Sequence, residues 1–241
     1  MMGRSTDTIP TLGEPVLGWK VPPEPHGLAL TGSFVQLVPL DPKTHAEALL
    51  PAYLGYDQVW DYLPYGPFET VDDYRAWMMT VTQLPAHQFF GIRNLEADAW
   101  QGVASYLRID PKNGSIEVGH INFSPALQGT RAATEAMYLM MRWAFENGYR
   151  RYEWKCNALN HASRRAAQRL GFSFEGVFRQ ATISKGRNRD TAWFAAIDKE
   201  WPRLEQAFKA WLAPDNFANG RQIRPLGDFT GPVRVASDPT L

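Results

Sequence analysis

The chain has 241 residues, 44% of them hydrophobic and 21% charged, which suits one globular domain with a full core. Basic and acidic residues number 25 each, and this balance argues against a general nucleic-acid binder. No apolar run reaches the roughly 20 residues of a membrane helix, and the polar, proline-bearing start is unlike a signal peptide. The single cysteine, Cys156, excludes an internal disulfide and fits a reducing compartment, so we expect a cytoplasmic protein.

Turn signals and hydrophobic periodicity divide the chain into three parts. Residues 1–30 hold five prolines and no sustained period, which predicts an irregular arm. Residues 31–198 form the predicted domain, and residues 199–241 are predicted to be a helix over 201–212 followed by coil. Within the domain we expect, in chain order, a strand over 33–39, two or three helical pieces over 42–84, strands over 87–93, 101–109 and 115–123, a helix over 131–147, a strand over 151–156, a helix over 160–170, and a hairpin with strands over 172–184 and 191–197.

The order of these elements predicts an α+β fold. Alternating strands and helices from residue 115 onward require a parallel pair around a crossover helix, whereas the hairpins require antiparallel pairs. The central sheet is therefore expected to be mixed, mostly antiparallel, and flanked by helices.

The predicted strand over 115–123 has an irregular apolar pattern. Ile116 and Val118 share one face under strict alternation, and Ile121 and Phe123 would then share the other. One extra residue near Gly119 would realign the two pairs, which indicates a β-bulge and leaves backbone groups free for an amide-bearing ligand. A strand buried on both faces, which needs no alternation, is the alternative.

The turn after this strand is rich in small residues and lies inside a basic block. Gln128–Glu135 leads into the long predicted helix, where exposed amides and the helix dipole favour phosphate. Residues 128–190 carry 12 basic and 5 acidic side chains, an excess that fits one anionic ligand. An ordinary solvated helix face with Arg164, Arg165 and Arg169 is the alternative explanation of that charge.

Several motifs together resemble the GNAT superfamily of N-acetyltransferases, and within it the RimJ/RimL-like branch. Gln128–Ala133 is similar to the Q/R-x-x-G-x-G/A pyrophosphate loop of that superfamily, although Arg131 stands in the place of its usual first glycine. The bulged strand before the loop and the motifs Asn157–Ser163 and Leu170–Phe172 after it keep the order of the family. The resemblance covers roughly residues 33–197 and implies the GNAT fold.

The resemblance also implies acetyl-CoA as the co-substrate, with no metal. The pantetheine arm would pair with the bulged strand at His120–Phe123 and lie between it and the strand Tyr152–Cys156. Arg131 is expected to reach the diphosphate rather than solvent. The implied cofactor-binding residues are Ile121, Asn122, Phe123, Gln128, Gly129, Thr130, Arg131, Ala132, Ala133, Thr134, Asn160 and Arg164.

For the reaction, the resemblance implies direct attack of a neutral amine on the thioester, aided by a base and by an acid for the departing thiolate. Many relatives use a tyrosine as the acid, but Ala167 occupies that position, and Ser163 matches the serine of RimL-like members. Glu117 and His120 are the candidate bases. Their alternative roles are structural, Glu117 as a cross-strand charge partner and His120 as a semi-buried imidazole with its hydrogen bonds satisfied. A water relay is the alternative to a dedicated base. Cys156 is expected to be a buried, inert thiol.

An aromatic region between the early helices is the predicted acceptor side. Tyr62, Tyr65 and Phe68 are the candidate substrate-binding residues, and packing of helices onto the sheet is their alternative role. The implied function is transfer of an acetyl group to a primary amine of a small molecule or a protein N-terminus. A catalytically inactive acyl-CoA-binding regulatory module is the alternative. We expect an amine-bearing acceptor as partner, no nucleic acid and no membrane, and a homodimer is one assembly that the family suggests.

Overall fold

The computed structural model describes residues 12–241, so the first part of the predicted arm lies outside the described residues. The strands of the main sheet are β1 (Leu30–Thr31), β2 (Val35–Pro39), β3 (Gln88–Asn94), β4 (Ala99–Asp110), β5 (Ser115–Phe123), β6 (Arg151–Asn157), β7 (Ser173–Ser184) and β8 (Arg187–Ile197). The helices are α1 (Pro42–Leu49), α2 (Val71–Val81), α3 (Arg131–Glu146), α4 (His161–Arg169), α5 (Trp201–Leu212) and α6 (Leu226–Thr230), and a small second sheet consists of β9 (Phe217–Ala218) and β10 (Arg221–Gln222). The predicted elements of the domain are confirmed, with ends shifted by a few residues and a hairpin turn shorter than expected.

The main sheet is mixed, as the order of the elements predicts. Its strand order is β1-β2-β3-β4-β5-β6-β8-β7, and the pair β5–β6 is parallel, with α3 as the crossover. The other neighbouring strands pair antiparallel. The parallel pair therefore lies inside the sheet, where α3 covers it.

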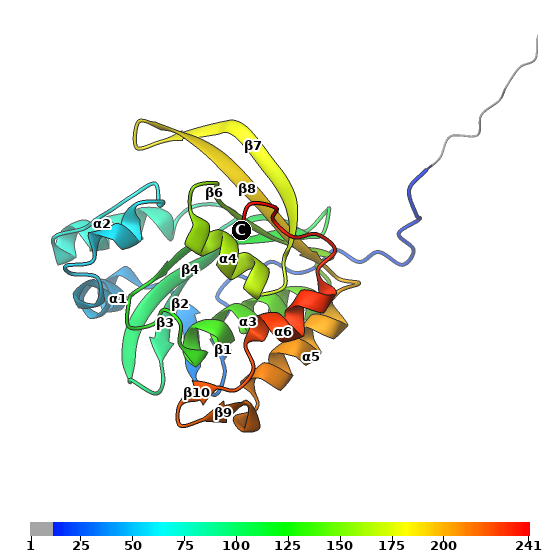
Figure 1. Ribbon diagram of the computed structural model, residues 1–241. Coiled ribbons are helices and arrows are strands. Elements are labelled where there is room, and N and C mark those ends of the chain that lie inside the picture. Colours follow the sequence, from blue (N-terminus) through cyan, green and yellow to red (C-terminus); the bar gives the residue numbers. More distant parts are fainter. Residues whose placement is uncertain (1–11) are drawn as a thin grey trace, which may run out of the picture.

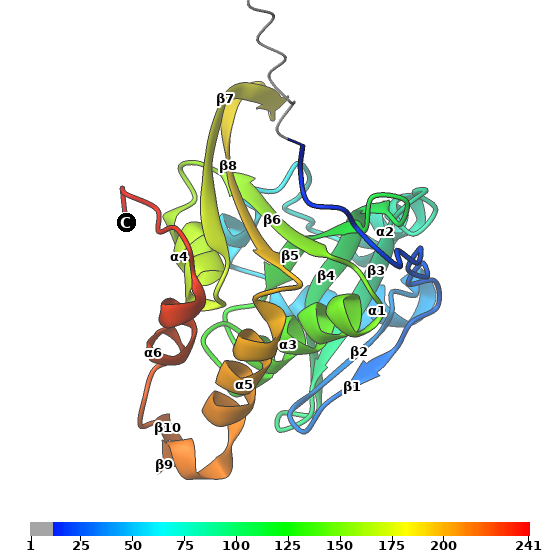
Figure 2. The same ribbon diagram turned by 90° about the vertical axis from the view of Figure 1, so that its right-hand side faces the viewer.

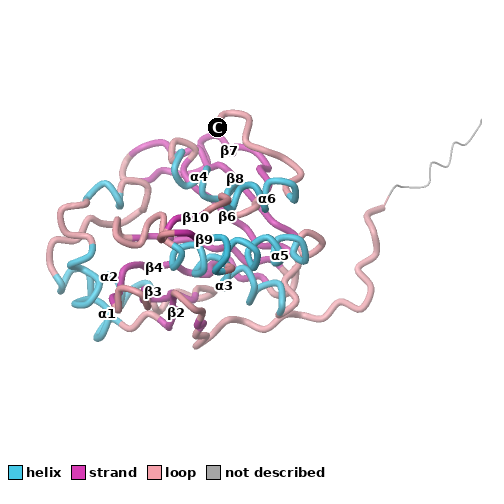
Figure 3. The backbone as a smooth tube through the Cα atoms, turned by 60° about the horizontal axis from the view of Figure 1, so that its bottom comes forward, coloured by secondary structure: helices cyan, strands magenta, loops and turns pink. Residues whose placement is uncertain are grey.

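Helices cover both faces of the sheet and make two hydrophobic clusters. On β3, Phe89 belongs to the cluster under α1 and α2, whereas the next residue, Phe90, belongs to the cluster under α3 and α5. This alternation is what a strand buried on both sides requires. Figures 1 and 2 show α1 and α2 grouped at one side of the sheet, and Figure 3 shows α5 lying beside α3. Among residues 12–241, no helix is long and apolar enough to cross a membrane.

The bulge predicted in β5 is confirmed. Val103 of β4 pairs with Asn122, but Ser105 pairs with Gly119, so two residues of β5 stand opposite one residue of β4. His120, the first of the two, has a φ of 50°, a left-handed conformation that bulges accommodate. As a result, Ile121 packs against the same cluster as Ile116 and Val118 despite the odd spacing.

The tail after α5 contains more structure than the sequence analysis predicts. The coil expected beyond residue 212 is wrong, because the tail forms β9, β10 and α6, and short 3-10 turns at Pro214–Asn216 and Gly231–Val233. Asn216 organises this segment by donating to the Trp211 carbonyl and accepting from the Arg224 amide. Short elements of two to five residues show little periodicity, so such side-chain bonds rather than patterning hold them.

Candidate active site

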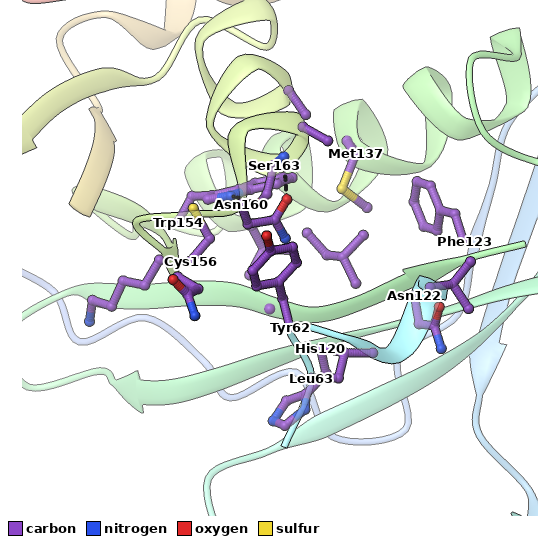
Figure 4. A pocket seen from close by; sticks show the side chains of 18 of the residues that line it. Tyr62, Leu63, His120, Asn122, Phe123, Met137, Trp154, Cys156, Asn160 and Ser163 are labelled. Atoms are coloured by element: carbon purple, nitrogen blue, oxygen red, sulfur yellow. Dashed lines mark hydrogen bonds between the residues drawn. The ribbon is translucent and has the colours of Figure 1, made fainter. Parts of the chain in front are cut away.

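A cavity of about 1010 Å³ opens where β5 and β6 separate. The two strands pair only as far as Val118 and Trp154, and the bulge turns β5 away just beyond that point. The walls of the cavity come from β5, β6, the start of α3, one face of α4, the β7–β8 hairpin and the segment before α2. Figure 4 shows Asn160 and Ser163 of the α4 region across this cavity from His120 of β5.

The loop before α3 supplies free amides to one end of the cavity. Thr130 caps α3 by accepting from the Ala133 amide, and Gly129 has a φ of 74°, which favours glycine. Within residues 12–241, the amides of Gly129, Arg131 and Ala132 have no acceptor. Donors at a helix N-terminus are suited to a diphosphate, and this end of the cavity therefore fits the phosphate-bearing part of acetyl-CoA.

One face of α4 lines the cavity beside this loop. Asn160 caps the helix by accepting from the Ser163 amide at 3.0 Å, and Ser163, Ala166 and Arg169 then follow at intervals of three residues on the cavity side. Arg169 donates to the Thr134 hydroxyl of α3 at 3.2 Å and is half-buried, and this burial lowers its pKa. Arg169 is thus the cation that lies at the start of α3, near the free amides. Its helical spacing from Ser163, on the same face of α4, is the sequence signal that identifies it.

Two other arginines that we expected to meet the phosphates do not face the cavity. The side chain of Arg131 turns outward, 2.6 Å from Glu96 and over the rings of Phe34 and Phe217. Arg164 is buried against the chain end, where it binds Asp238. The expected role of each side chain at the diphosphate is therefore wrong, because an acidic residue far away in the sequence holds each guanidinium elsewhere.

The remaining predicted cofactor-binding residues form two groups, those that line the cavity and those that do not. Ile121, Asn122, Phe123, Gln128, Gly129, Ala133, Thr134 and Asn160 line the cavity. Thr130 and Ala132 do not line the cavity: Thr130 is the N-cap of α3, and Ala132 is the second residue of that helix, with an amide that has no acceptor among residues 12–241.

Ser163 is placed with its hydroxyl proton available. The Trp154 indole Nε1 donates to Ser163 Oγ at 3.0 Å. Because indole N–H can only donate, Ser163 accepts in this bond and keeps its own hydrogen to donate, with Cys156 Sγ as one acceptor within reach. Cys156 lies beside Ser163, and burial raises the pKa of its thiol, which agrees with the expected inert cysteine.

Glu117 forms an ion-pair cluster on the face of the sheet opposite α3. Its carboxylate lies 2.9 Å from Lys155 Nζ and 3.3 Å from Arg108 Nε, and Lys155 also contacts Glu153 at 2.6 Å. Burial raises the pKa of Glu117, while the two cations act in the opposite direction. The structure thus contains the cross-strand charge partner that we considered, and the carboxylate still lines the cavity.

His120 projects from the bulge into the cavity. Burial, followed by the charges of His87 and Arg189, lowers its pKa to about 4, so the imidazole is neutral at pH 7. Its Nδ1 lies 3.0 Å from the Tyr65 hydroxyl, and the two rings are stacked with centroids 5.6 Å apart. Both candidate bases therefore border the same cavity as Ser163.

Only one of the three predicted acceptor-side aromatics lines the cavity. Tyr62 does so and donates from its hydroxyl to the Leu159 carbonyl at 3.1 Å. The assignment of Tyr65 and Phe68 to the lining is wrong, because both pack into the cluster beneath α2, where each contacts Trp60 and Trp77. Tyr65 still reaches the site indirectly, through its contact with His120.

Comparison with known proteins identifies the family. Residues 35–173 match the sequence family described as "Acetyltransferase (GNAT) domain". The chain belongs to the GNAT family of N-acetyltransferases. As a GNAT enzyme it transfers the acetyl group of acetyl-CoA to an amine.

Three relatives show how far the similarity extends. A GCN5-related N-acetyltransferase from Brucella melitensis is 41% identical, with a TM-score of 0.86 over 89% of this chain and 99% of that one. A probable GNAT-family acetyltransferase from Chromobacterium violaceum is also 41% identical, with a TM-score of 0.76 over 80% of this chain and 98% of that one. Ribosomal-protein-serine acetyltransferase from Escherichia coli is 31% identical over 97 residues, which are 40% of this chain and 54% of the relative. The last similarity supports the RimJ/RimL-like branch within the GNAT family.

Proposed function

We propose that acetyl-CoA binds across the opening between β5 and β6, with its diphosphate on the α3 N-terminus. The observation that carries this proposal is the set of free amides at Gly129, Arg131 and Ala132, next to the half-buried guanidinium of Arg169. The diphosphate is anionic, and both the helix dipole and this cation stabilise it there. The pantetheine arm carries amides that suit the unpaired edges of the two strands beyond Val118 and Trp154.

The activated thioester supplies the acetyl group, and the residues of this chain orient it and move protons. The amine nitrogen forms a bond to the acetyl carbon, the carbon–sulfur bond breaks, and the proton lost by the nitrogen balances the proton gained by the CoA sulfur. Ser163 donates that second proton, because Trp154 Nε1 occupies its acceptor side and directs its hydrogen elsewhere, and solvent then returns a proton to Ser163 and takes up the one held by Glu117. This assignment gives Ser163 the role that a tyrosine at the position of Ala167 plays in other family members.

Glu117 accepts the proton of the amine in this proposal. Among the described residues that line the cavity, Glu117 is the only carboxylate, and burial raises its pKa toward the range useful for a base. His120, with a pKa of about 4, stays neutral and forms a polar wall beside the reacting atoms.

The direct test is an acetyl-transfer assay with the purified protein, acetyl-CoA and a panel of primary amines, read as release of free thiol. We expect thiol release that depends on the amine and is lost in Glu117→Gln. If acetyl-CoA protects the protein against heat while no amine is acetylated, the chain acts as the acyl-CoA-binding module instead, and the catalytic roles given to Ser163 and Glu117 are wrong.

A further inference from the structure

One side of strand β8 carries a row of three polar side chains that have no hydrogen-bond partner among residues 12–241, and this row lines the cavity. Arg189, Thr191 and Trp193 alternate with residues that face the other way, so all three project from the same face of the strand. Within residues 12–241, none of the three side chains makes a hydrogen bond or a salt bridge. The Nε atom of Arg189 and the Nε1 atom of Trp193 are both buried.

Buried donors without acceptors are costly, and the half-buried guanidinium of Arg189, whose Nε is buried, has no anion beside it among residues 12–241. Thr191 is 7% exposed, and Trp193 is held on both sides, by Phe178 at 4.5 Å between ring centroids and by Lys155 Nζ at 3.7 Å from its ring. Thr191 and Trp193 are therefore held in place by packing, and Arg189 lies half-buried beside them on the strand. Its donors suit one chemical group, an oxyanion.

The row lies apart from the place proposed for the diphosphate. Trp193 pairs with Lys155 on β6, and Lys155 joins Glu117 on the face of the sheet opposite α3. Figures 1 and 2 show the β7–β8 hairpin rising on the side of the sheet away from α3, whose N-terminus holds the free amides. The three donors thus face the acceptor half of the cavity.

The charged residues that line the cavity also favour an anionic group on the acceptor. Among residues 12–241, four basic residues border it, Arg108, Lys155, Arg169 and Arg189, and Glu117 is the single carboxylate. Arg108 and Lys155 both contact Glu117, and Arg169 belongs to the cofactor end. Arg189 is the cation that remains for the acceptor, and a polyamine, with several positive charges, would be repelled here.

We propose that the acceptor is a primary amine that also carries an anionic group, a carboxylate or a phosphate, which binds to Arg189, Thr191 and Trp193. This inference rests on the proposed function, because the amine must reach Glu117 while its anionic group occupies the β8 row. Arg189 then determines specificity, since a guanidinium binds a carboxylate or a phosphate through two parallel hydrogen bonds.

The test uses sets of amines that differ in one group: free α-amino acids, their carboxamides, and aminoalkylphosphonates. We expect kcat/KM for an acidic member to exceed that of its carboxamide, and Arg189→Gln to lower kcat/KM of the acidic member about 10- to 100-fold, which removes most of its advantage over the carboxamide. A preference for the amino acids indicates a carboxylate as the anionic group, and a preference for the aminoalkylphosphonates indicates a phosphate. Arg179→Gln, an exposed arginine of β7 outside the cavity lining, is the control and should change neither.

A binding measurement separates this inference from the proposed function. N-acetylated amino acids, N-acetylated aminoalkylphosphonates and N-acetylated carboxamides are titrated by calorimetry into the complex of the protein with CoA, whose phosphates already occupy the α3 end. We expect an anionic compound to bind at least about 10-fold more tightly than its neutral counterpart, and Arg189→Gln to abolish the difference. Equal binding of anionic and neutral compounds would overturn the inference even if some amine is acetylated, whereas absence of turnover alone would count against the proposed function.

Discussion

The guanidinium of Arg164 donates from Nε to a carboxylate oxygen of Asp238, 2.7 Å away, and so joins α4 to the end of the chain. Both side chains are buried, with 6% and 0% of their surfaces exposed. The Asp238 amide also donates to Gln168, one helical turn further along α4. The tail thus holds the helix that carries Ser163 on its cavity face.

Removing one member of this pair should destabilise the tail. We expect Asp238→Ala to lower the free energy of unfolding by about 3 kcal/mol, because it leaves a buried guanidinium without its anion. Urea denaturation measures the loss, and hydrogen exchange should show faster exchange in α4 and in residues 226–241. Glu14→Ala removes an ion pair with Lys199 whose side chains are 72% and 85% exposed, and it should leave stability unchanged.

Ser163→Ala should lower kcat about 100-fold while leaving the Kd of acetyl-CoA nearly the same, because the proton donor acts only as the sulfur departs. Steady-state kinetics and calorimetry give the two numbers. Cys156→Ala is the matched control and should keep its turnover. Unchanged kcat in Ser163→Ala would remove this residue from the mechanism.

The two arginines near the α3 N-terminus should behave differently. Arg169→Gln should weaken acetyl-CoA binding about 10-fold or more, since it removes a charge beside the free amides. Arg131→Gln should leave the Kd unchanged, because its side chain already pairs with Glu96 outside the cavity. Calorimetry at two salt concentrations measures the Kd of acetyl-CoA for both variants. A larger loss of affinity in Arg131→Gln than in Arg169→Gln would refute the placement of the diphosphate.

Thr130→Asp tests the same end of the cavity without disturbing the helix. Aspartate caps a helix as well as threonine does, so the bond to the Ala133 amide should persist, whereas the bond that the Thr130 hydroxyl donates to the Leu127 carbonyl is lost. The added negative charge should repel the diphosphate and raise the Kd of acetyl-CoA about 10-fold or more. Thr130→Ser, which keeps the cap and adds no charge, should bind normally. Equal affinity in Thr130→Asp would count against the proposed site.

His120 should make stability depend on pH. Its pKa is about 4 in the folded protein and about 6.5 in the unfolded chain, so the unfolded chain binds more protons between these values. The free energy of unfolding should therefore decrease as the pH falls from 6.5 toward 4, by up to about 3 kcal/mol from this residue. In His120→Asn, which tolerates the positive φ, that part of the decrease should be absent when urea midpoints are compared across the same range. Parallel pH dependences of the two proteins would show that His120 does not titrate in this way.

The amino-acid sequence determined the elements and the places where their regularity breaks. The phase of the apolar residues in β5 indicated a bulge, with a strand buried on both faces as the alternative, and the structure contains the bulge. The small residues at Gln128–Ala133 predicted the loop that offers its amides. These features depend on neighbouring residues alone, through alternation, turn chemistry and helix capping. The order of the elements then required the mixed sheet.

Only the tertiary structure decided which side chain of a motif faces the site. Arg164 and Arg131 looked suited to the phosphates, but Asp238 and Glu96 hold them, 74 and 35 residues away in the sequence. Conversely, the donors on β8 belong to the site only because β8 pairs with β6 in the folded sheet. A charged side chain takes the partner that folding brings within hydrogen-bond distance, and short-range patterns carry no information about that distance. The position of Ser163 shows both effects, since its sequence context predicted the helix start, and the packing of Trp154 oriented its hydroxyl.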